Sequence, residues 1–162
     1  MDNPQASLRE AMVAGMWLAD GFVSSAYREN RTRGKTMTLV PQAGYTSKDY
    51  DYIEFISQVL SENDVGHYII ERKRIPKRAR TWNLTVIGHK RFRAWYQLFR
   101  PHLFGRKAEI ADALFATHDP LAGGYGPKPK PQEQQDKELA AHLLTRRLNS
   151  TEASETIMVG AA

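Results

Sequence analysis

A single carboxylate, Asp20, stands at the end of an apolar stretch that reads V-A-G-M-W-L-A-D-G from Val13 to Gly21. Carboxylate oxygens and backbone carbonyls are the hard ligands that Mg²⁺ prefers. One such acid in isolation makes a poor metal site. Two copies of the segment meeting at their ends would bring two carboxylates together, where they repel unless a divalent cation binds between them. The segment therefore suggests half of a symmetric metal site.

The same stretch carries small residues at a spacing of four, namely Ala11, Gly15 and Ala19. Such a stripe on a helix lets a second helix backbone approach closely. The natural partner is the same helix in a second chain, packed about a two-fold axis. The two helix ends would then present unpaired carbonyls and the negative poles of their dipoles at one point. The alternative is that the stripe faces this chain's own sheet, and the sequence leaves both open.

The elements that would position this segment follow from periodicity and turn residues. Ser7 and Glu10 form a potential capping box at the start of the first helix, and Gly21 ends it. The pattern predicts helices over 7–20, 47–63, 90–99, 107–117 and 136–148, and strands over 22–28, 36–42, 66–74 and 81–87. The order is α-β-β-α-β-β-α-α plus a C-terminal helix. This order indicates an α+β fold, one antiparallel sheet covered by helices on one face.

The other face of that sheet is predicted to be polar and basic. Alternation along the strands assigns to it Ser24, Ala26, Arg28, Asn30, Thr36, Thr38, Arg72, Arg74 and Arg80. Charge supports the same conclusion, because residues 28–107 hold 17 Lys/Arg against 7 Asp/Glu in a chain of net charge +5. Such a surface suits a polyanion, and the 14 arginines suit bidentate contacts to phosphate and guanine. A merely solvated basic surface is the alternative.

Residues 13–21 resemble the LAGLIDADG motif of homing endonucleases, with the Ala-Gly pair and the final Ala-Asp-Gly in place. The resemblance is to the short, single-motif members and covers nearly the full length. It implies the αββαββα fold, with a curved sheet lying in the DNA major groove. It implies a homodimer with Ala11, Gly15 and Ala19 at the interface. It also implies Mg²⁺-dependent hydrolysis, with Ca²⁺ or Mn²⁺ as substitutes, that breaks both strands of a long pseudo-palindromic site.

The resemblance also implies roles for individual residues. Asp20 would bind the metal, helped by the Ala19 carbonyl. The family has a basic residue near the start of a late helix after a P-x-L-type segment, and Pro101 to Lys107 resembles that setting. Arg106 or Lys107 would take the role, and we favour Arg106. A polar residue before the second helix positions water in the family, and here Thr46, Ser47 or Lys48 occupies the place, with Ser47 preferred.

The residues expected to contact DNA lie on the sheet and its two turns. They are Ser24, Arg28, Asn30, Arg31, Arg33, Lys35, Thr36, Thr38, Gln42, Arg72, Arg74, Lys77, Arg78, Arg80 and Asn83. A two-stranded ribbon fits the major groove, and two subunits side by side would read two half-sites. Some of these arginines would contact only phosphate and would carry no sequence information.

Bulk properties exclude several classes of protein. No apolar run reaches 18 residues, so no membrane span is expected. The chain has no cysteine, which excludes disulfides, thiolate nucleophiles and Cys-type zinc sites. The N-terminus has no targeting signal, so an intracellular location with the host genome is expected, in cytoplasm, nucleoid or organelle. We expect a core domain over 1–119, then a linker and a C-terminal helix on the same domain over 120–162, with a loose tail after about Asn149.

Two rival functions stay open at this point. One is a non-catalytic nucleic-acid binder of the same fold, either an intron maturase, which would bind RNA, or a DNA-binding regulator. Retention of the acid at position 20 and of a basic residue near 106 favours the nuclease over this rival. The other is a basic winged or ribbon-type regulator, for which a monomer in solution would be evidence.

Overall fold

The structure is a computed structural model that describes residues 4–30, 36–72, 79–118 and 130–160, with backbone alone at 4–7, 30, 36 and 151–160. Its elements are α1 (Pro4–Asp20), β1 (Gly21–Asn30), β2 (Thr36–Ser47), α2 (Tyr50–Glu62), β3 (Tyr68–Arg72), β4 (Thr81–Ile87), α3 (His89–Phe99), the 3₁₀ turn η1 (Arg100–His102), α4 (Gly105–Ala116) and α5 (Gln132–Gly160). The predicted order of helices and strands is confirmed. Among the described helices, none is both long and apolar enough to cross a bilayer.

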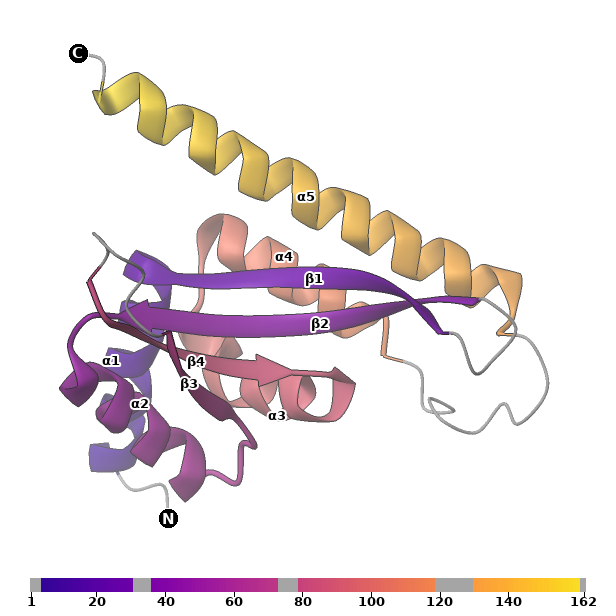
Figure 1. Cartoon of the computed structure of the whole chain (residues 1–162). Helices are drawn as coiled ribbons and strands as arrows, with labels where there is room; N and C mark the ends of the chain where they lie inside the picture. The colour runs from indigo at the N-terminus through magenta and orange to yellow at the C-terminus, as the bar shows by residue number, and fades with distance from the viewer. Residues whose placement is uncertain (1–3, 31–35, 73–78, 119–129, 161–162) are drawn as a thin grey trace.

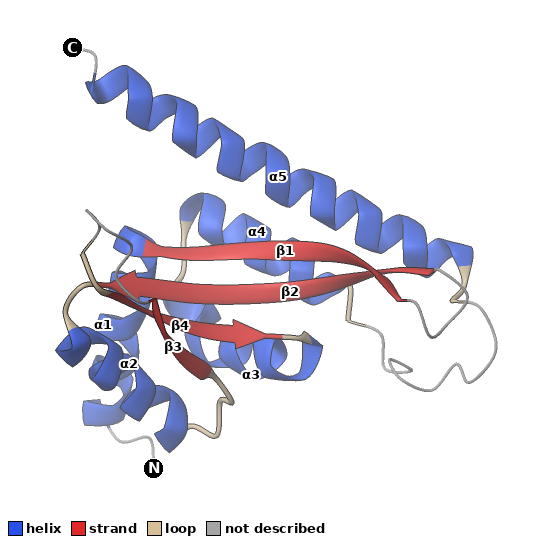
Figure 2. Ribbon diagram, in the orientation of Figure 1, coloured by secondary structure: helices blue, strands red, loops and turns tan. Residues whose placement is uncertain are grey.

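The four strands form one antiparallel sheet in the order β1-β2-β4-β3 (Figure 1). β1 and β2 pair along ten residues, from Gly21↔Tyr45 to Asn30↔Thr36. β4 pairs with β2 over only six, from Gln42↔Ile87 to Ser47↔Trp82. The half of the β1–β2 hairpin nearer its turn therefore extends beyond β4, and Figure 2 shows the two long strands reaching past the shorter ones.

Helices cover one face of the sheet. Val23 of β1, Leu39 and Ala43 of β2, and Leu84 and Val86 of β4 are almost fully buried on this face. They pack against an aromatic cluster in which the Trp17 ring lies 5.5 Å from that of Trp95 and 5.7 Å from that of Phe99. The α+β fold with helices on one face, predicted from element order, is confirmed.

Several predicted boundaries were wrong. α1 begins at Pro4, so Ser7 lies inside the helix and is not its N-cap; proline suits a first helical turn, where its missing N–H is not needed. β2 continues to Ser47, because Gln42 to Ser47 gain β4 as a second neighbour. Asp49 is the N-cap of α2, its side chain accepting from the Asp51 amide.

The last helix is longer than predicted at both ends. α5 begins at Gln132 and runs to Gly160, where the sequence predicts a loose tail after about Asn149. No proline or glycine interrupts residues 149–159, so nothing in the chain forces the helix to stop earlier. α5 packs on β1, β2 and α4, on the helix side of the sheet.

Candidate functional site

The motif helix α1 has two distinct faces. Val13, Ala14 and Trp17 are buried in the core. The opposite face is exposed, with Leu8 at 63% and Met12 at 53% of their full accessibility. Gly15 and Ala19 lie on that exposed face, and a Cβ placed on Gly15 would meet no atom of this chain within 4 Å. Of the two interpretations left open above, packing on the chain's own sheet is therefore excluded for Gly15 and Ala19, while Ala11 is half-buried.

The end of α1 runs directly into β1 with no intervening loop. This junction requires Gly21, because a Cβ there would lie 2.8 Å from the backbone of Trp17. The Trp17 indole Nε1 donates to the carbonyl of Phe22 at 3.3 Å, which ties the helix to the first residues of the strand. Asp20 is thus held at a fixed point between the end of α1 and the sheet, with its side chain exposed.

Lys107 reaches the same helix end from α4. Its Nζ donates to the carbonyl of Trp17 at 3.1 Å and to that of Leu18 at 2.7 Å. These carbonyls belong to the last turn of α1, where a helix lacks backbone donors and carries the negative end of its dipole. A positive charge is therefore favourable here. Leu18, one of the two acceptors, precedes the predicted metal ligands Ala19 and Asp20 by one and two residues.

Hydrogen bonds in the turn before α4 position Lys107 at the end of α1. Arg100 donates to Asp112 through Nε at 2.5 Å and Nη2 at 2.9 Å, and through Nη1 to the Leu103 carbonyl at 3.3 Å. These contacts hold the segment before α4. Hydrogen bonds from Arg100 keep the pKa of Asp112 below its ordinary value, with the Tyr96 hydroxyl acting in the same direction. Arg106, also in the first turn of α4, has a half-buried side chain.

Tyr45 lies beside the acid, as the register partner of Gly21. Its ring centroid is 6.5 Å from that of Trp17. Burial raises the pKa of Tyr45, and the negative charge of Asp20 raises it further. Asp20 itself has no ion pair among the described residues. Nor does the described part of the chain contain any group of three or more His, Asp or Glu that could hold a metal.

The predicted water-positioning residue has a structural contact of its own. The Ser47 Oγ accepts from the Asp49 amide at 3.0 Å and so shapes the turn before α2. Its hydroxyl proton stays available to a further partner. Thr46 is exposed on the opposite face of the sheet, where its hydroxyl donates to Asn83 at 3.3 Å. Lys48 is exposed just before the Asp49 cap.

The open face of the sheet carries most of the predicted DNA contacts. Strand register and alternation place on it Ser24, Arg28, Thr38, Gln42, Arg72 and Asn83, while the side chains of Asn30 and Thr36 lie outside the described part of the chain. The Gln42 amide donates to the Ser24 hydroxyl at 2.8 Å, so these two side chains are already ordered. Tyr68 and Ile70 of β3 share this face and are exposed, a feature that sequence reasoning missed because β3 lacks a clear polar alternation. Six predicted residues lie outside the described part of the chain, namely Arg31, Arg33, Lys35, Arg74, Lys77 and Arg78.

Arg80 is the exception among the described residues, and its assignment to the open face was wrong. Its guanidinium pairs with Glu71 and lies 5.5 Å from the ring centroid of Trp82. Both partners alternate onto the helix side of the sheet. In the alternation of β4, Arg80 falls on the same side of the sheet as Trp82 and Leu84. The ion pair with Glu71 of β3 holds its guanidinium on that side.

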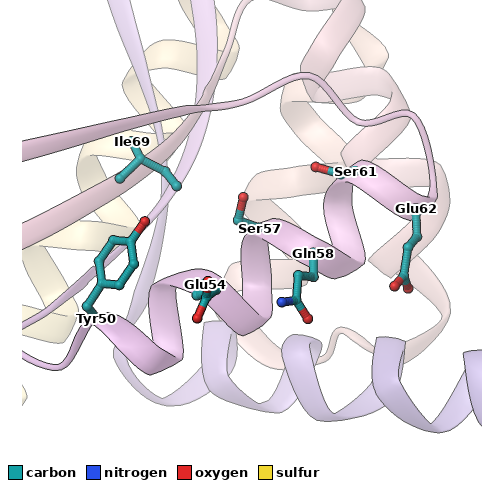
Figure 3. Close-up of a pocket in the computed structure, with 7 residues that line it drawn as sticks. All are labelled: Tyr50, Glu54, Ser57, Gln58, Ser61, Glu62 and Ile69. Carbon is teal, nitrogen blue, oxygen red and sulfur yellow. The ribbon is translucent and has the colours of Figure 1, made fainter.

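A groove of about 350 Å³ lies between α2 and β3 (Figure 3). It is lined by Tyr50, Glu54, Ser57, Gln58, Ser61, Glu62 and Ile69. Ile69 alternates with Tyr68 and Ile70, so the groove opens on the helix side and not on the open face. Its two carboxylates make it unsuited to a polyanion, and it plays no part in the arrangement around Asp20.

A comparison with models of protein families identifies the family of this chain. The model of the LAGLIDADG-like domain matches residues 7–99, more than half of the chain. The protein belongs to the LAGLIDADG family. No curated protein sequence was found to match this LAGLIDADG chain.

Solved structures of LAGLIDADG proteins agree in fold. The homing endonuclease I-CvuI, in complex with its target in the presence of Ca, has a TM-score of 0.66 at 16% identity, covering 91% of this chain and 83% of that one. The homing endonuclease I-TnaI has a TM-score of 0.61 at 16% identity, covering 95% and 99%. I-SmaMI bound to cleaved DNA has a TM-score of 0.59 at 13% identity, but only 42% of its chain is matched. At these identities the likeness establishes the LAGLIDADG endonuclease fold.

The family match ends at Phe99, before two of the elements that surround the site. α4 brings Lys107, and α5 packs against the long hairpin, yet both lie outside the matched segment. The sequence signal for Lys107 was its place after Pro101 and Leu103, and this signal could not separate it from Arg106. For Tyr45 and for the contacts of α5 the sequence held no signal, since each depends on pairing between distant segments.

Proposed function

We propose that this LAGLIDADG protein is a homodimeric, site-specific endonuclease that breaks both strands of a long pseudo-palindromic DNA site. The observation that carries the proposal is the joint position of three features. An exposed small-residue face on α1, an exposed Asp20 at its end and a polar open sheet face all meet at one junction. Packing α1 against its copy would bring two such junctions together and place two open faces side by side.

The donor set at the end of α1 fits a hard divalent cation such as Mg²⁺. The Asp20 carboxylate is exposed, and the Ala19 carbonyl stands in the last helical turn, with Ca²⁺ or Mn²⁺ able to use the same oxygens. A bound divalent cation would supply an activated water and charge neutralisation at the leaving oxygen. Structures of I-CvuI with DNA were obtained in the presence of Mg and of Ca, which supports divalent metal use in this family.

The chain's own residues would complete the reaction. Water attacks phosphorus and the bond to the 3′-oxygen breaks, which leaves a 5′-phosphate and a 3′-hydroxyl. Asp20 binds the cation. Lys107, and not Arg106, is assigned the basic role, because its ammonium already lies at the helix end that carries Asp20. That charge would offset the negative charge that develops on the phosphate. Ser47 stays our candidate for positioning water through its remaining hydroxyl donor.

The test is selection of cleaved sequences from a randomised duplex pool with Mg²⁺, against EDTA, using the wild type and Asp20→Asn. The wild type is expected to cut a two-fold-related site. Asp20→Asn is expected to lose at least a thousandfold in cutting, since it removes a metal ligand, while DNA affinity stays within about threefold. Affinity should also fall steeply with salt through counterion release.

Equal cutting by Asp20→Asn would refute the catalytic assignment. Specific binding by the wild type without cutting would instead favour the rival function, a regulator on DNA or a maturase on RNA. A monomer at micromolar concentration, both free and on DNA, would refute the shared site.

A further inference from the structure

The free half of the β1–β2 hairpin lacks a neighbouring strand. Residues 36–41 of β2 pair with β1 but lie beyond the end of β4, whose pairing with β2 stops at Gln42↔Ile87. We call this part, with its β1 partners 25–30, the overhang. An isolated two-stranded ribbon is marginally stable in water, so something other than a strand must hold the overhang in place.

Side chains and a loop replace the missing strand along this edge. The Leu39 amide donates to the Glu138 carboxylate at 3.0 Å, and the Leu39 carbonyl contacts His89 Nε2 at 2.8 Å. The Pro41 carbonyl accepts from the Gly88 amide at 3.0 Å, and proline has no N–H to satisfy. The hydrogen-bonding groups that Leu39 and Pro41 turn toward this edge are therefore occupied by Gly88, by His89 of α3 and by Glu138 of α5.

Glu138 is built into this position. Its side chain is only 2% exposed, an unusual burial for a carboxylate. Lys130 Nζ donates to both of its oxygens at 2.8 Å, and the Gln134 amide donates at 3.2 Å. With the Leu39 amide, these donors satisfy the buried charge. Removal of the Glu138 carboxylate would leave the Leu39 N–H without a hydrogen-bond acceptor and the mostly buried Lys130 ammonium without a counter-charge.

α5 also contacts β1, the other strand of the overhang. His142 Nδ1 lies 2.9 Å from the Ser25 hydroxyl, and the His142 ring stacks on that of Tyr27 with centroids 5.4 Å apart. Further along, the Asn149 amide donates to the Val23 carbonyl at 3.3 Å. Figure 1 shows α5 running along the length of the hairpin. The opposite surface of the same strands carries Arg28 and Thr38, which the alternation turns toward the open face.

We infer that Glu138 is a positioning residue for DNA recognition, which fixes the overhang through the Leu39 amide and thereby sets which bases Arg28 and Thr38 read. The inference rests on the proposed function for its DNA half, and α5 lies outside the segment matched by the family model. Gln42 and Asn83 provide an internal control. They share the open face but lie where β2 is flanked by β4, so their readout does not depend on Glu138.

The test compares Glu138→Ala with two matched variants. Glu133→Ala removes a carboxylate from the exposed side of the same helix, where its side chain is 82% exposed. Glu138→Gln combined with Lys130→Met keeps an acceptor for Leu39 while removing both charges. Amide hydrogen exchange at Leu39 is measured by NMR, and DNA affinity is measured across a target series in which each base pair of a half-site is substituted in turn.

Glu138→Ala is expected to speed exchange of the Leu39 amide by roughly tenfold or more, the effect of losing one buried hydrogen bond. It should flatten the base preference at the positions read by the overhang and leave the preference nearer the cut unchanged. The double variant and Glu133→Ala should resemble the wild type in both measurements. Ile56→Ala, a core variant in α2, controls for general destabilisation and should shift no base preference.

The outcomes separate the two proposals. Unchanged Leu39 exchange in Glu138→Ala, or a uniform loss of preference that Ile56→Ala reproduces, would overturn the positioning role. Failure of the wild type to bind any DNA would overturn the proposed function and the recognition half with it, while the exchange data would still decide whether Glu138 holds the overhang. If Glu138→Ala does not fold, Glu138→Met combined with Lys130→Met, which fills the site but offers Leu39 no acceptor, carries the same expectation.

Discussion

The two halves of the β1–β2 hairpin are held by different forces. The half that begins at Gly21 and Tyr45 is flanked by β4 and rests on the rings of Trp17, Trp95 and Phe99. The overhang has no third strand; Leu39 anchors it in the core, and its edge is held by a carboxylate, histidines and a backbone amide. Apolar packing resists displacement in all directions, whereas hydrogen bonds are directional and replaceable one at a time. We therefore expect the half next to Asp20 to be the stiffer, and the overhang, which carries Arg28 and Thr38, to be the more easily altered.

The largest effect that this comparison predicts is on stability. Trp17→Ala removes the ring at the centre of the aromatic cluster and should lower the free energy of unfolding by about 3–5 kcal/mol. Tyr27→Ala, in the overhang, removes a half-buried ring that stacks on His142, so a loss of under about 2 kcal/mol is expected. Urea denaturation of both variants is the measurement. Equal losses would show that the two halves do not differ in the way we describe.

The next effect concerns catalysis at the stiff end. Lys107→Met should reduce cleavage by about 10²–10³-fold, because it removes the cation at the end of α1. Arg106→Met is the matched control, one residue away in the same turn, and should retain most of its activity. Single-turnover cleavage of a selected site at saturating enzyme distinguishes them. The reverse ranking would return the basic role to Arg106, the residue that the sequence alone favours.

A third prediction isolates the exposed face of α1. Gly15→Glu should leave the fold of each chain intact, because no atom lies within 4 Å of the new Cβ and glutamate favours a helix over glycine by roughly 0.5 kcal/mol. The same change places a charge in the proposed dimer contact, so the protein should sediment as a monomer and lose double-strand cleavage. Circular dichroism and sedimentation equilibrium measure the two properties. A dimer that persists in this variant would place the subunit contact elsewhere.

The smallest predicted effect is the pH dependence of the overhang. Burial lowers the pKa of His89 below its ordinary value of 6.5; the Leu39 carbonyl and Glu138 act against this, while His118 and Lys130 act with it. Burial lowers the pKa of His142 as well, helped by Arg146. The unfolded chain therefore binds protons that the folded chain does not. Stability is fully present above about pH 6.5 and declines as the pH falls below it.

His89→Gln provides the control for this dependence. Glutamine can still donate to the Leu39 carbonyl but does not titrate, so thermal unfolding between pH 7.5 and 5 should show a shallower decline. An identical decline in the variant would locate the titration elsewhere in the molecule.

The elements and the site differ in how much the sequence reveals. Apolar periodicity was sufficient for the order of helices and strands, because each signal is local; β4 was predicted to the residue as Thr81–Ile87. Asp20 and the open face followed from the motif and from alternation. Arg80 was misassigned because its place depends on Glu71, nine residues away on another strand. The sequence named Lys107 beside Arg106 but could not choose between them, and it gave no signal for Glu138, because the contacts of Lys107 with α1 and of Glu138 with Leu39 span 89 or more residues.

Because glycine has no side chain, the close junction at Gly21 has a consequence for how the proposed endonuclease could acquire new DNA targets. In the proposed endonuclease, the scaffold would set the distance from the scissile phosphate to each recognised base pair, because strand and helix meet there at backbone contact. Substitutions along the strands would change which base pairs are recognised. They would leave the spacing between the recognised bases and the proposed cut unchanged.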